Sequence, residues 1–323
     1  MPRAFLIDTD TASDDAVALI MALRHPDVDV KAITVVAGNV NLAQATRNAL
    51  YTMELCGANV PVFMGADRPL VREHEHAEWF HGADGLGDNF YPEPKAKPQP
   101  ASAVDGIIQT IPANPGLTLV TLGPLTNIAR ALQKDPTIAQ RVSRCVVMGG
   151  NPCCEGNVTP AAEYNIWVDP EAARIVFHSG LPIEMVGWHL CRGAANLLEN
   201  DIRRIRAIGT PLANFAIDAN RRAMEANRIQ TGEIGIPLPD PTAMAVAINP
   251  TIATQVSDHL VEIETQSNLT RGMTVVDRLN VTRDSRNRAA WTELLQSNGP
   301  HPKIIWTIDI PRWKQLLFDL LIG

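Results

Sequence analysis

Short runs of apolar residues alternate with helical patterns along most of this chain. Runs such as AFLI, VKAITVVAG, LTLVTLG and CVVMGG precede stretches with helical spacing, such as NLAQATRNALYTMEL and TNIARALQKD. Uninterrupted apolar strands are buried on both faces, so this alternation predicts a parallel sheet covered by helices on both sides. We therefore predict an α/β fold with a doubly wound, mostly parallel open sheet. Ligands bind beyond the carboxyl ends of such strands, which makes the residues after each run candidates for chemistry.

Three regions depart from this alternation. Residues 65–102 form a long segment ending in YPEPKAKPQPAS, and loops of that length in compact domains are usually functional or mobile. Residues 221–239 are polar and interrupted by Gly and Pro, which suits a flap. The tail from about residue 254 carries HLVEIET, TVVDR and KIIWTIDI before a closing helix, which indicates a small C-terminal β-rich appendage. Because no internal repeat or linker is visible, we expect residues 1–323 to form a single domain.

The charge balance restricts the class of partner. With 28 Lys and Arg against 35 Asp and Glu, the net charge of −7 provides no basic field for a polyanion. We therefore expect no nucleic-acid polymer and no membrane surface as a partner, whereas small neutral substrates remain open. No apolar run reaches about 18 residues, and MPRAFLIDTD leaves no room for a secretory signal before the first strand. We expect a cytoplasmic protein.

The segment DTDTASDD places four aspartates directly after the first apolar run, at Asp8, Asp10, Asp14 and Asp15. Several buried carboxylates repel one another unless protons or a cation compensate. Since all the candidate ligands are oxygens, a hard ion such as Ca²⁺ or Mg²⁺ is favoured over zinc. One alternative is that Ser13 or Asp14 caps a helix and the other carboxylates are solvated.

A second alternative is the DxDx(T/V) pattern of haloacid-dehalogenase-type phosphatases, which DTDTA almost fits. Its fifth position is Ala12, however, and no convincing later lysine and acidic motif follows.

Further motifs occur in a fixed order: AGNVN at 37–41, HGADGLG at 81–87, LGPLTNIA at 122–129, MGGN at 148–151, GNVTPAAEYNIWVDPEAA at 156–173 and DPTAM at 240–244. With DTDTASDD, this set resembles the inosine-uridine-preferring nucleoside hydrolase family over three quarters of the chain. The resemblance implies a nucleoside N-ribohydrolase, that is, a Ca²⁺-dependent enzyme that cleaves a small ribonucleoside to ribose and a free base. It also implies nucleoside salvage or catabolism, and a homodimer or homotetramer.

The resemblance carries specific residues. The metal ligands would be Asp10, Asp15, Asp240 and the backbone carbonyl of Leu122, and Asp10 would also be the general base. Contacts to the sugar would come from Asp14, Asn39, Met148, Asn157, Glu163 and Asn165. For three of these residues the sequence also allows a purely structural role. Asp240 before Pro241 would make a good N-cap, and Asn39 and Asn157 follow glycines, as turn residues do.

One position departs from the family. Many members that act on inosine or uridine place His before the last metal-binding aspartate, and purine-preferring members place Trp, whereas this chain has Pro239. We therefore expect the leaving base to be assisted from elsewhere, with His81 and His189 as catalytic candidates. Trp79 or Trp188 could stack on the base.

The sequence does not choose between purine and pyrimidine nucleosides. Two other functions stay open at this point: a related glycosidase for a non-standard ribosyl compound, and a non-catalytic, metal-dependent nucleoside-binding protein.

Overall fold

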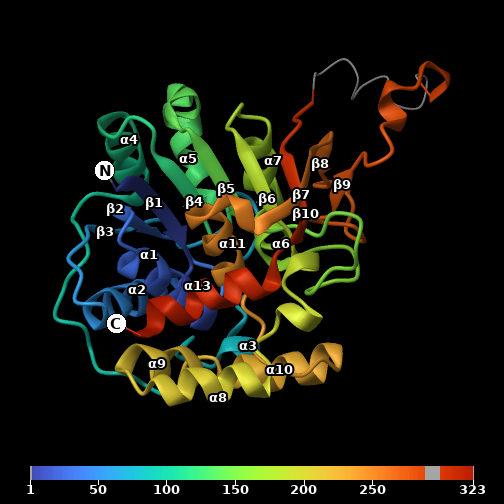
Figure 1. The fold of residues 1–323 in the computed structure, drawn as a ribbon. Helices are drawn as coiled ribbons and strands as arrows, with labels where there is room; N and C mark the ends of the chain where they lie inside the picture. The colour runs from blue at the N-terminus through green and yellow to red at the C-terminus, as the bar shows by residue number, and fades with distance from the viewer. Residues whose placement is uncertain (1, 288–298, 323) are drawn as a thin grey trace.

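An eight-stranded sheet runs through the middle of the molecule, as the computed structural model shows for residues 2–287 and 299–322 (Figure 1). The strand order is β3-β2-β1-β4-β5-β6-β10-β7, and only the last pair is antiparallel. The strands are β1 (Arg3–Thr9), β2 (Val28–Val35), β3 (Val62–Met64), β4 (Thr118–Thr121), β5 (Arg144–Met148), β6 (Ile183–Val186), β7 (Ala253–Asp258) and β10 (Lys303–Ile308). The predicted doubly wound, mostly parallel sheet is confirmed.

The order in which successive strands are added to the sheet reverses at β1. Strands β2 and β3 extend the sheet on one side of β1, and β4, β5 and β6 extend it on the other. The carboxyl ends of β1 and β4 are tied together, because the backbone N–H of Leu122 donates to the carbonyl of Asp8 at 2.8 Å. This reversal of strand order opens a crevice where doubly wound folds bind ligands.

Helices cover both faces of the sheet. They are α1 (Ser13–Arg24), α2 (Leu42–Leu55), α3 (Glu78–His81), α4 (Ala103–Ala113), α5 (Thr126–Lys134), α6 (Tyr164–Val168), α7 (Pro170–Phe177), α8 (Glu199–Ile208), α9 (Pro211–Asp218), α10 (Arg221–Thr231), α11 (Pro239–Ile248) and α13 (Ile310–Ile322). Short 3₁₀ helices are η1 (Pro136–Arg141), η2 (Trp188–Leu190), η3 (Gly193–Ala195), η4 (Pro250–Ile252), η5 (Val281–Arg283) and η6 (Ser285–Asn287).

The sheet divides the interior into two apolar cores. Residues Phe5 and Ile7 of β1 face the core built by α1, α2, α11 and α13, whereas Leu6 faces the core built by α4, α5 and α7. This alternation is the period of two that a strand imposes on its side chains. Because both faces of the central strands are apolar, the strands read in the sequence as continuous hydrophobic runs.

The C-terminal tail differs in part from the expected appendage. Strand β10 pairs with β6 and β7, so KIIWTIDI completes the main sheet, and α13 packs back on the core. The physical reason is that Ile304 and Ile305 are both buried, one in each core, which requires cover on both faces. Among the described residues of the tail, β8 (Val261–Ile263) and β9 (Thr274–Val276) form a separate antiparallel pair.

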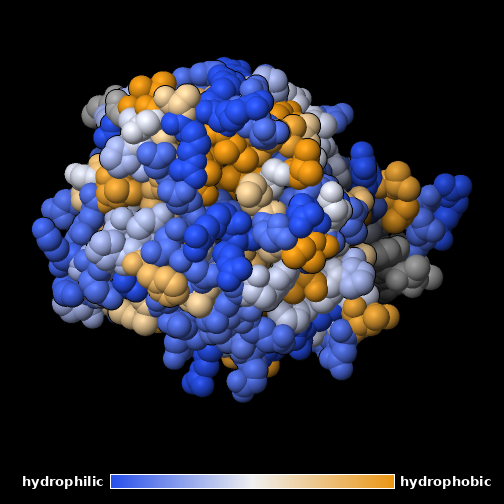
Figure 2. All heavy atoms as spheres, turned by 90° about the horizontal axis from the view of Figure 1, so that it is seen from below, coloured by the Kyte–Doolittle hydropathy of each residue, from blue (hydrophilic) through white to orange (hydrophobic). Residues whose placement is uncertain are grey.

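The expected flap also has a different form. Residues 221–231 are the helix α10, which ends at Gly232 in the left-handed conformation. With α8 and α9 it forms a layer below the sheet in Figure 1, and Figure 2, which looks onto that side, shows a largely hydrophilic surface with separate hydrophobic patches. None of the helices in the described ranges is long and apolar enough to cross a bilayer.

Candidate functional site

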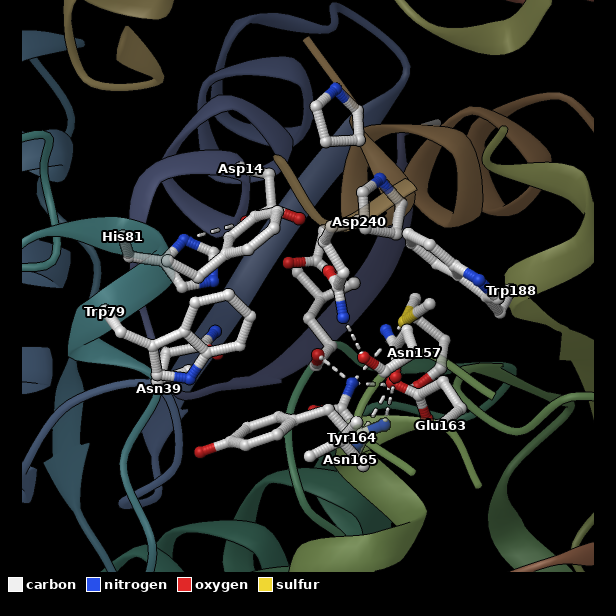
Figure 3. Close-up of a pocket in the computed structure, with 18 residues that line it drawn as sticks. Asp14, Asn39, Trp79, His81, Asn157, Glu163, Tyr164, Asn165, Trp188 and Asp240 are labelled. Carbon is white, nitrogen blue, oxygen red and sulfur yellow. Dashed lines mark hydrogen bonds and ion pairs between the residues drawn. The ribbon is translucent and has the colours of Figure 1, made fainter. Parts of the chain in front are cut away.

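A cavity lies at the carboxyl ends of β1, β4 and β5 (Figure 3). Its walls come from strand ends, from α1, α3, α6, α10 and α11, and from the loops between them. The lining side chains on which the chemistry depends are Asp14, Asn39, Trp79, His81, Met148, Asn157, Glu163, Tyr164, Asn165, Trp188, Gln230, Pro239 and Asp240. None of the described lining residues is a lysine or an arginine.

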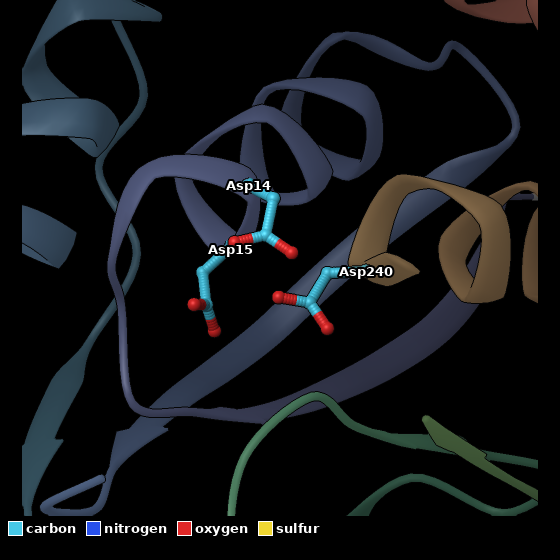
Figure 4. A group of neighbouring side chains, drawn as sticks. All are labelled: Asp14, Asp15 and Asp240. Atoms are coloured by element: carbon cyan, nitrogen blue, oxygen red, sulfur yellow. The ribbon is translucent and has the colours of Figure 1, made fainter. Parts of the chain in front are cut away.

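An acidic cluster lies at this cavity, with Asp14 and Asp240 in its lining and Asp15 buried beside them. Asp14 and Asp15 lie in the first turn of α1, and Asp240 lies in the first turn of α11. Each offers a carboxylate oxygen within 4.8 Å of the other two (Figure 4). Two helix N-termini therefore point at one cluster of negative charge, which their dipoles favour.

Asp10 is held against the same cluster by close backbone approach. Its Oδ2 accepts the backbone N–H of Asn39 at 2.6 Å. Its Oδ1 has no hydrogen-bond partner in the described chain and lies against Gly123, where an added Cβ would come within 2.6 Å. A side chain at Gly38 would likewise overlap the Asp10 carboxylate. Glycine is thus required on both sides of Asp10.

The electrostatics of the cluster call for a compensating charge. Burial raises the pKa of Asp10, Asp15 and Asp240, and mutual repulsion adds to the effect at Asp10 and Asp240. Burial, and after it repulsion from Asp15, raises the pKa of Asp14 to about 7. The buried Oδ1 atoms of Asp10 and Asp14 lack partners within the described ranges.

Oxygen ligands that are buried, negatively charged and partly unpaired fit a hard divalent cation. The backbone carbonyl of Leu122, which also lines the cavity, accepts from Asn165 Nδ2 at 2.8 Å and has a second lone pair available.

The six side chains expected to contact a sugar all line this cavity. Glu163 caps α6, accepting the N–H of Asn165 at 3.0 Å, and it also accepts the N–H of Gly150 at 2.8 Å. Asn39 Nδ2 donates to Asp15 at 3.3 Å, and Asn157 Oδ1 accepts the N–H of Tyr164 at 2.9 Å. These bonds fix the direction of each polar group, so the site is preorganised.

The structure separates the two histidine candidates. His81 is buried at the end of α3 and lines the cavity, with Nδ1 2.7 Å from Ser13 Oγ and 3.8 Å from Asp14 Oδ1 (Figure 3). Burial lowers the pKa of His81 to about 3, so its imidazole is neutral at neutral pH.

The expectation for His189 needs correction. His189 does not line the cavity, and its Nε2 lies 3.0 Å from the carbonyl oxygen of Ile305 in β10. The 3₁₀ turn after β6 places Trp188 in the cavity wall and turns the next side chain toward β10. This position removes His189 from the candidates for assisting the leaving base.

Two polar lining residues, Tyr164 and Gln230, were not predicted from the sequence. The hydroxyl oxygen of Tyr164 lies 2.9 Å from the carbonyl oxygen of Gly38 and 2.8 Å from that of Glu75, so its one proton can be donated to either. This contact ties the 65–102 segment to the cavity. Gln230 on α10 donates to the carbonyl of Asn157. Tyr164 could have been found from the sequence, because it lies within the motif at 156–173. No sequence pattern marks Gln230, because its position at the cavity depends on how α10 packs.

Comparison with known proteins gives a consistent result. A family model described as inosine-uridine preferring nucleoside hydrolase matches residues 5–315. A pyrimidine-specific ribonucleoside hydrolase RihA from Shewanella baltica (strain OS155 / ATCC BAA-1091) is 43% identical over 290 residues, covering 89% of this chain and 90% of that protein.

Solved structures agree. The plant nucleoside hydrolase PpNRh1 superposes with a TM-score of 0.91 at 33% identity, covering 100% of both chains. A purine-preferring ribonucleoside hydrolase from Gardnerella vaginalis superposes with a TM-score of 0.86 at 30% identity, covering 99% of this chain and 98% of that one.

Proposed function

This chain belongs to the inosine-uridine preferring nucleoside hydrolase family and is an N-glycosidase, and we propose that it uses Ca²⁺ to hydrolyse pyrimidine ribonucleosides to ribose and a free base. The acidic cluster carries the proposal. Asp14, with an unpaired buried oxygen, and Asp240 line a cavity whose walls also present neutral amides and one further carboxylate, and the unpaired Oδ1 of Asp10 is buried nearby. This surface is suited to an uncharged polyol beside a cation.

The proposed calcium ligands are Asp10, Asp15, Asp240 and the carbonyl of Leu122. The geometric cluster contains Asp14 in place of Asp10. We assign Asp10 because its free Oδ1 is buried beside Gly123, and we assign Asp14 to the sugar because it lines the open cavity. A bound Ca²⁺ would lower the pKa of a water molecule and hold the two ribose hydroxyls.

The protein side of the proposed reaction follows from the residue positions. Oδ1 of Asp10 would take a proton from the attacking water, while Oδ2 stays fixed by the N–H of Asn39. Cleavage of an N-glycosidic bond builds positive charge on the sugar, which the buried carboxylates favour. Asn157, Glu163 and Asn165 would hold the ribose hydroxyls, because their bonds within the protein orient them into the cavity.

Preference for a pyrimidine base rests on the relatives named pyrimidine-specific, which are closer in sequence than the structural neighbours named for purine or for inosine and guanosine. We also keep as proposals a single functional domain over residues 1–323, assembly as a homodimer or homotetramer, a role in nucleoside salvage or catabolism, and a cytoplasmic location. No nucleic-acid or membrane partner is proposed.

A reducing-sugar assay against uridine, cytidine, inosine, adenosine and guanosine tests the proposal, with native protein, chelated protein, and chelated protein given back Ca²⁺ or Mg²⁺. We expect ribose release from uridine or cytidine that chelation abolishes and Ca²⁺ restores. Activity that survives chelation would refute the metal requirement. Faster release from purine nucleosides would refute the pyrimidine preference, and no release from any of the five would point to a non-standard ribosyl substrate.

A further inference from the structure

The buried hydroxyl of Ser13 contacts the ring of His81. Ser13 is the first residue of α1 and is fully buried, and its Oγ lies 2.7 Å from His81 Nδ1. Serine at a helix start usually caps the helix. Here the cap position belongs to Ala12, and within the described chain the only hydrogen-bond partner of Ser13 Oγ is His81. The Ser13 hydroxyl is therefore hydrogen-bonded to His81 and does not cap the helix.

The hydrogen bonds available to Ser13 Oγ and His81 Nδ1 decide which of the two atoms is the donor. If Nδ1–H donated to Ser13, the serine proton would be buried without an acceptor in the described chain, which is costly. If Ser13 donates, both atoms are satisfied and the neutral imidazole carries its proton on Nε2. The charged group nearest Nδ1 is Asp14, whose Oδ1 is 3.8 Å away and beyond hydrogen-bonding distance.

The other ring nitrogen faces the cavity. His81 lines the cavity, as Trp79 and Pro239 do, and no protein hydrogen bond to Nε2 occurs in residues 2–287 and 299–322. Pro239 has no side-chain donor. A donor that Pro239 at the start of α11 cannot offer is therefore available in the same cavity from His81 on α3.

We propose that Ser13 is a positioning residue that fixes the proton of His81 on Nε2, so that the neutral imidazole donates a hydrogen bond to the departing base. When the C1′–N bond breaks, its electron pair goes to the base, and the negative charge spreads over the base oxygens. The Nε2–H group stabilises that charge without giving up its proton, and the base afterwards takes a proton from water. This inference rests on the proposed hydrolase function.

Two substrates separate the role of Ser13 from the function itself. Uridine needs help for its leaving group, whereas 4-nitrophenyl β-D-ribofuranoside releases a stable anion and needs only the ribose and water side of the site. We expect Ser13→Ala to lower kcat on uridine by about tenfold, the worth of one hydrogen bond, with little change in KM. On the nitrophenyl riboside we expect a loss of less than about threefold.

Companion variants test whether Ser13 acts through the histidine. His81→Ala should lose about a hundredfold on uridine, and the double variant with Ser13→Ala should lose no more than that. Ser13→Thr keeps the hydroxyl and should stay within about threefold of the unmodified enzyme on uridine. Melting curves identify any variant whose loss comes from misfolding.

The outcomes are distinguishable. If the unmodified enzyme hydrolyses neither substrate, the proposed function fails. If it hydrolyses both and Ser13→Ala reduces both rates by the same factor, or neither, the function stands and the role of Ser13 is refuted. A Ser13→Thr enzyme as slow as Ser13→Ala on uridine, but normal on the nitrophenyl riboside, would also refute it.

Discussion

Replacing Asp10 by asparagine removes one charge and the proposed base while preserving shape. In the structure Oδ2 of Asp10 accepts the N–H of Asn39, and Oδ1 is unpaired beside Gly123. The carbonyl oxygen of an asparagine can keep the bond to Asn39, so its NH₂ would occupy the position of Oδ1. That group can neither accept a proton nor bind Ca²⁺, so the variant is compared with the unmodified enzyme only after its own Ca²⁺ saturation has been established. We expect kcat on uridine to fall about 10³-fold, within the range for removal of a general base, or about 4 kcal/mol in the barrier.

The assay follows ribose release at saturating Ca²⁺, and equilibrium binding of ribose reports the ground state. We expect ribose affinity to change by less than about tenfold, because the sugar-facing groups on α1 and α6 are untouched. Asp8→Asn is the matched control. Like Asp10, Asp8 is fully buried and is not among the residues that line the cavity. It differs in that its Oδ1 accepts from Thr34 and Asn127 and in that it is not one of the proposed calcium ligands. We expect this control to lose less than about tenfold. An Asp10→Asn enzyme that keeps a tenth or more of its activity would refute Asp10 as the base.

Three further results are expected. Asp240→Ala should weaken Ca²⁺ binding, measured by calorimetry, at least about tenfold, and unchanged affinity would leave Asp240 as a first-turn helix residue only. His189→Ala should change kcat on uridine by less than about threefold, since its ring lies outside the cavity and bonds the Ile305 carbonyl, and a large loss with normal melting would contradict that position. Chelation should lower the melting temperature by about 5 °C at pH 7.5 and by less at pH 5.5. Burial raises the pKa of Asp14 to about 7, against about 3.9 in an unfolded chain, so between these values the folded, metal-free protein binds more protons and loses stability as pH rises. An equal or larger shift at pH 5.5 would contradict this account.

The sheet and its acidic edge were predictable because both depend on local sequence. Each buried strand reads as an apolar run, and the residues after a run meet at one edge of the sheet whatever the details of packing. Asp10, Asn39 and Met148 are placed in this way, each at or just beyond the end of a parallel strand. The family motifs supplied the residues that no periodicity marks, such as Asn157.

The errors arose where tertiary packing decides. The strand at residues 303–308 follows two short strand patterns in the tail, which favours an appendage, yet its buried Ile304 and Ile305 pack in the two cores and the strand pairs into the main sheet. His189 follows a strand as a site residue should, but a 3₁₀ turn reverses which of two adjacent side chains faces the cavity. Trp188 therefore lines the cavity while its neighbour His189 contacts β10. No local sequence pattern predicts which of the two faces the cavity.

The site has two halves with different structural origins. The carboxylates and the sugar-facing groups come mainly from strand ends and from the first turns of α1, α6 and α11, which the sheet holds rigidly. The opposite wall, with Trp79, His81 and Gln230, comes from α3, α10 and the long 65–102 segment, whose placement depends on side-chain bonds such as that of Gln230 to the Asn157 carbonyl. Elements outside the sheet can vary without disturbing the rigid half. A fold of this kind can therefore keep the proposed ribose and metal site while relatives are named for different bases. His81 on α3 lines the same cavity as Pro239, so it is available as the donor that Pro239 cannot supply.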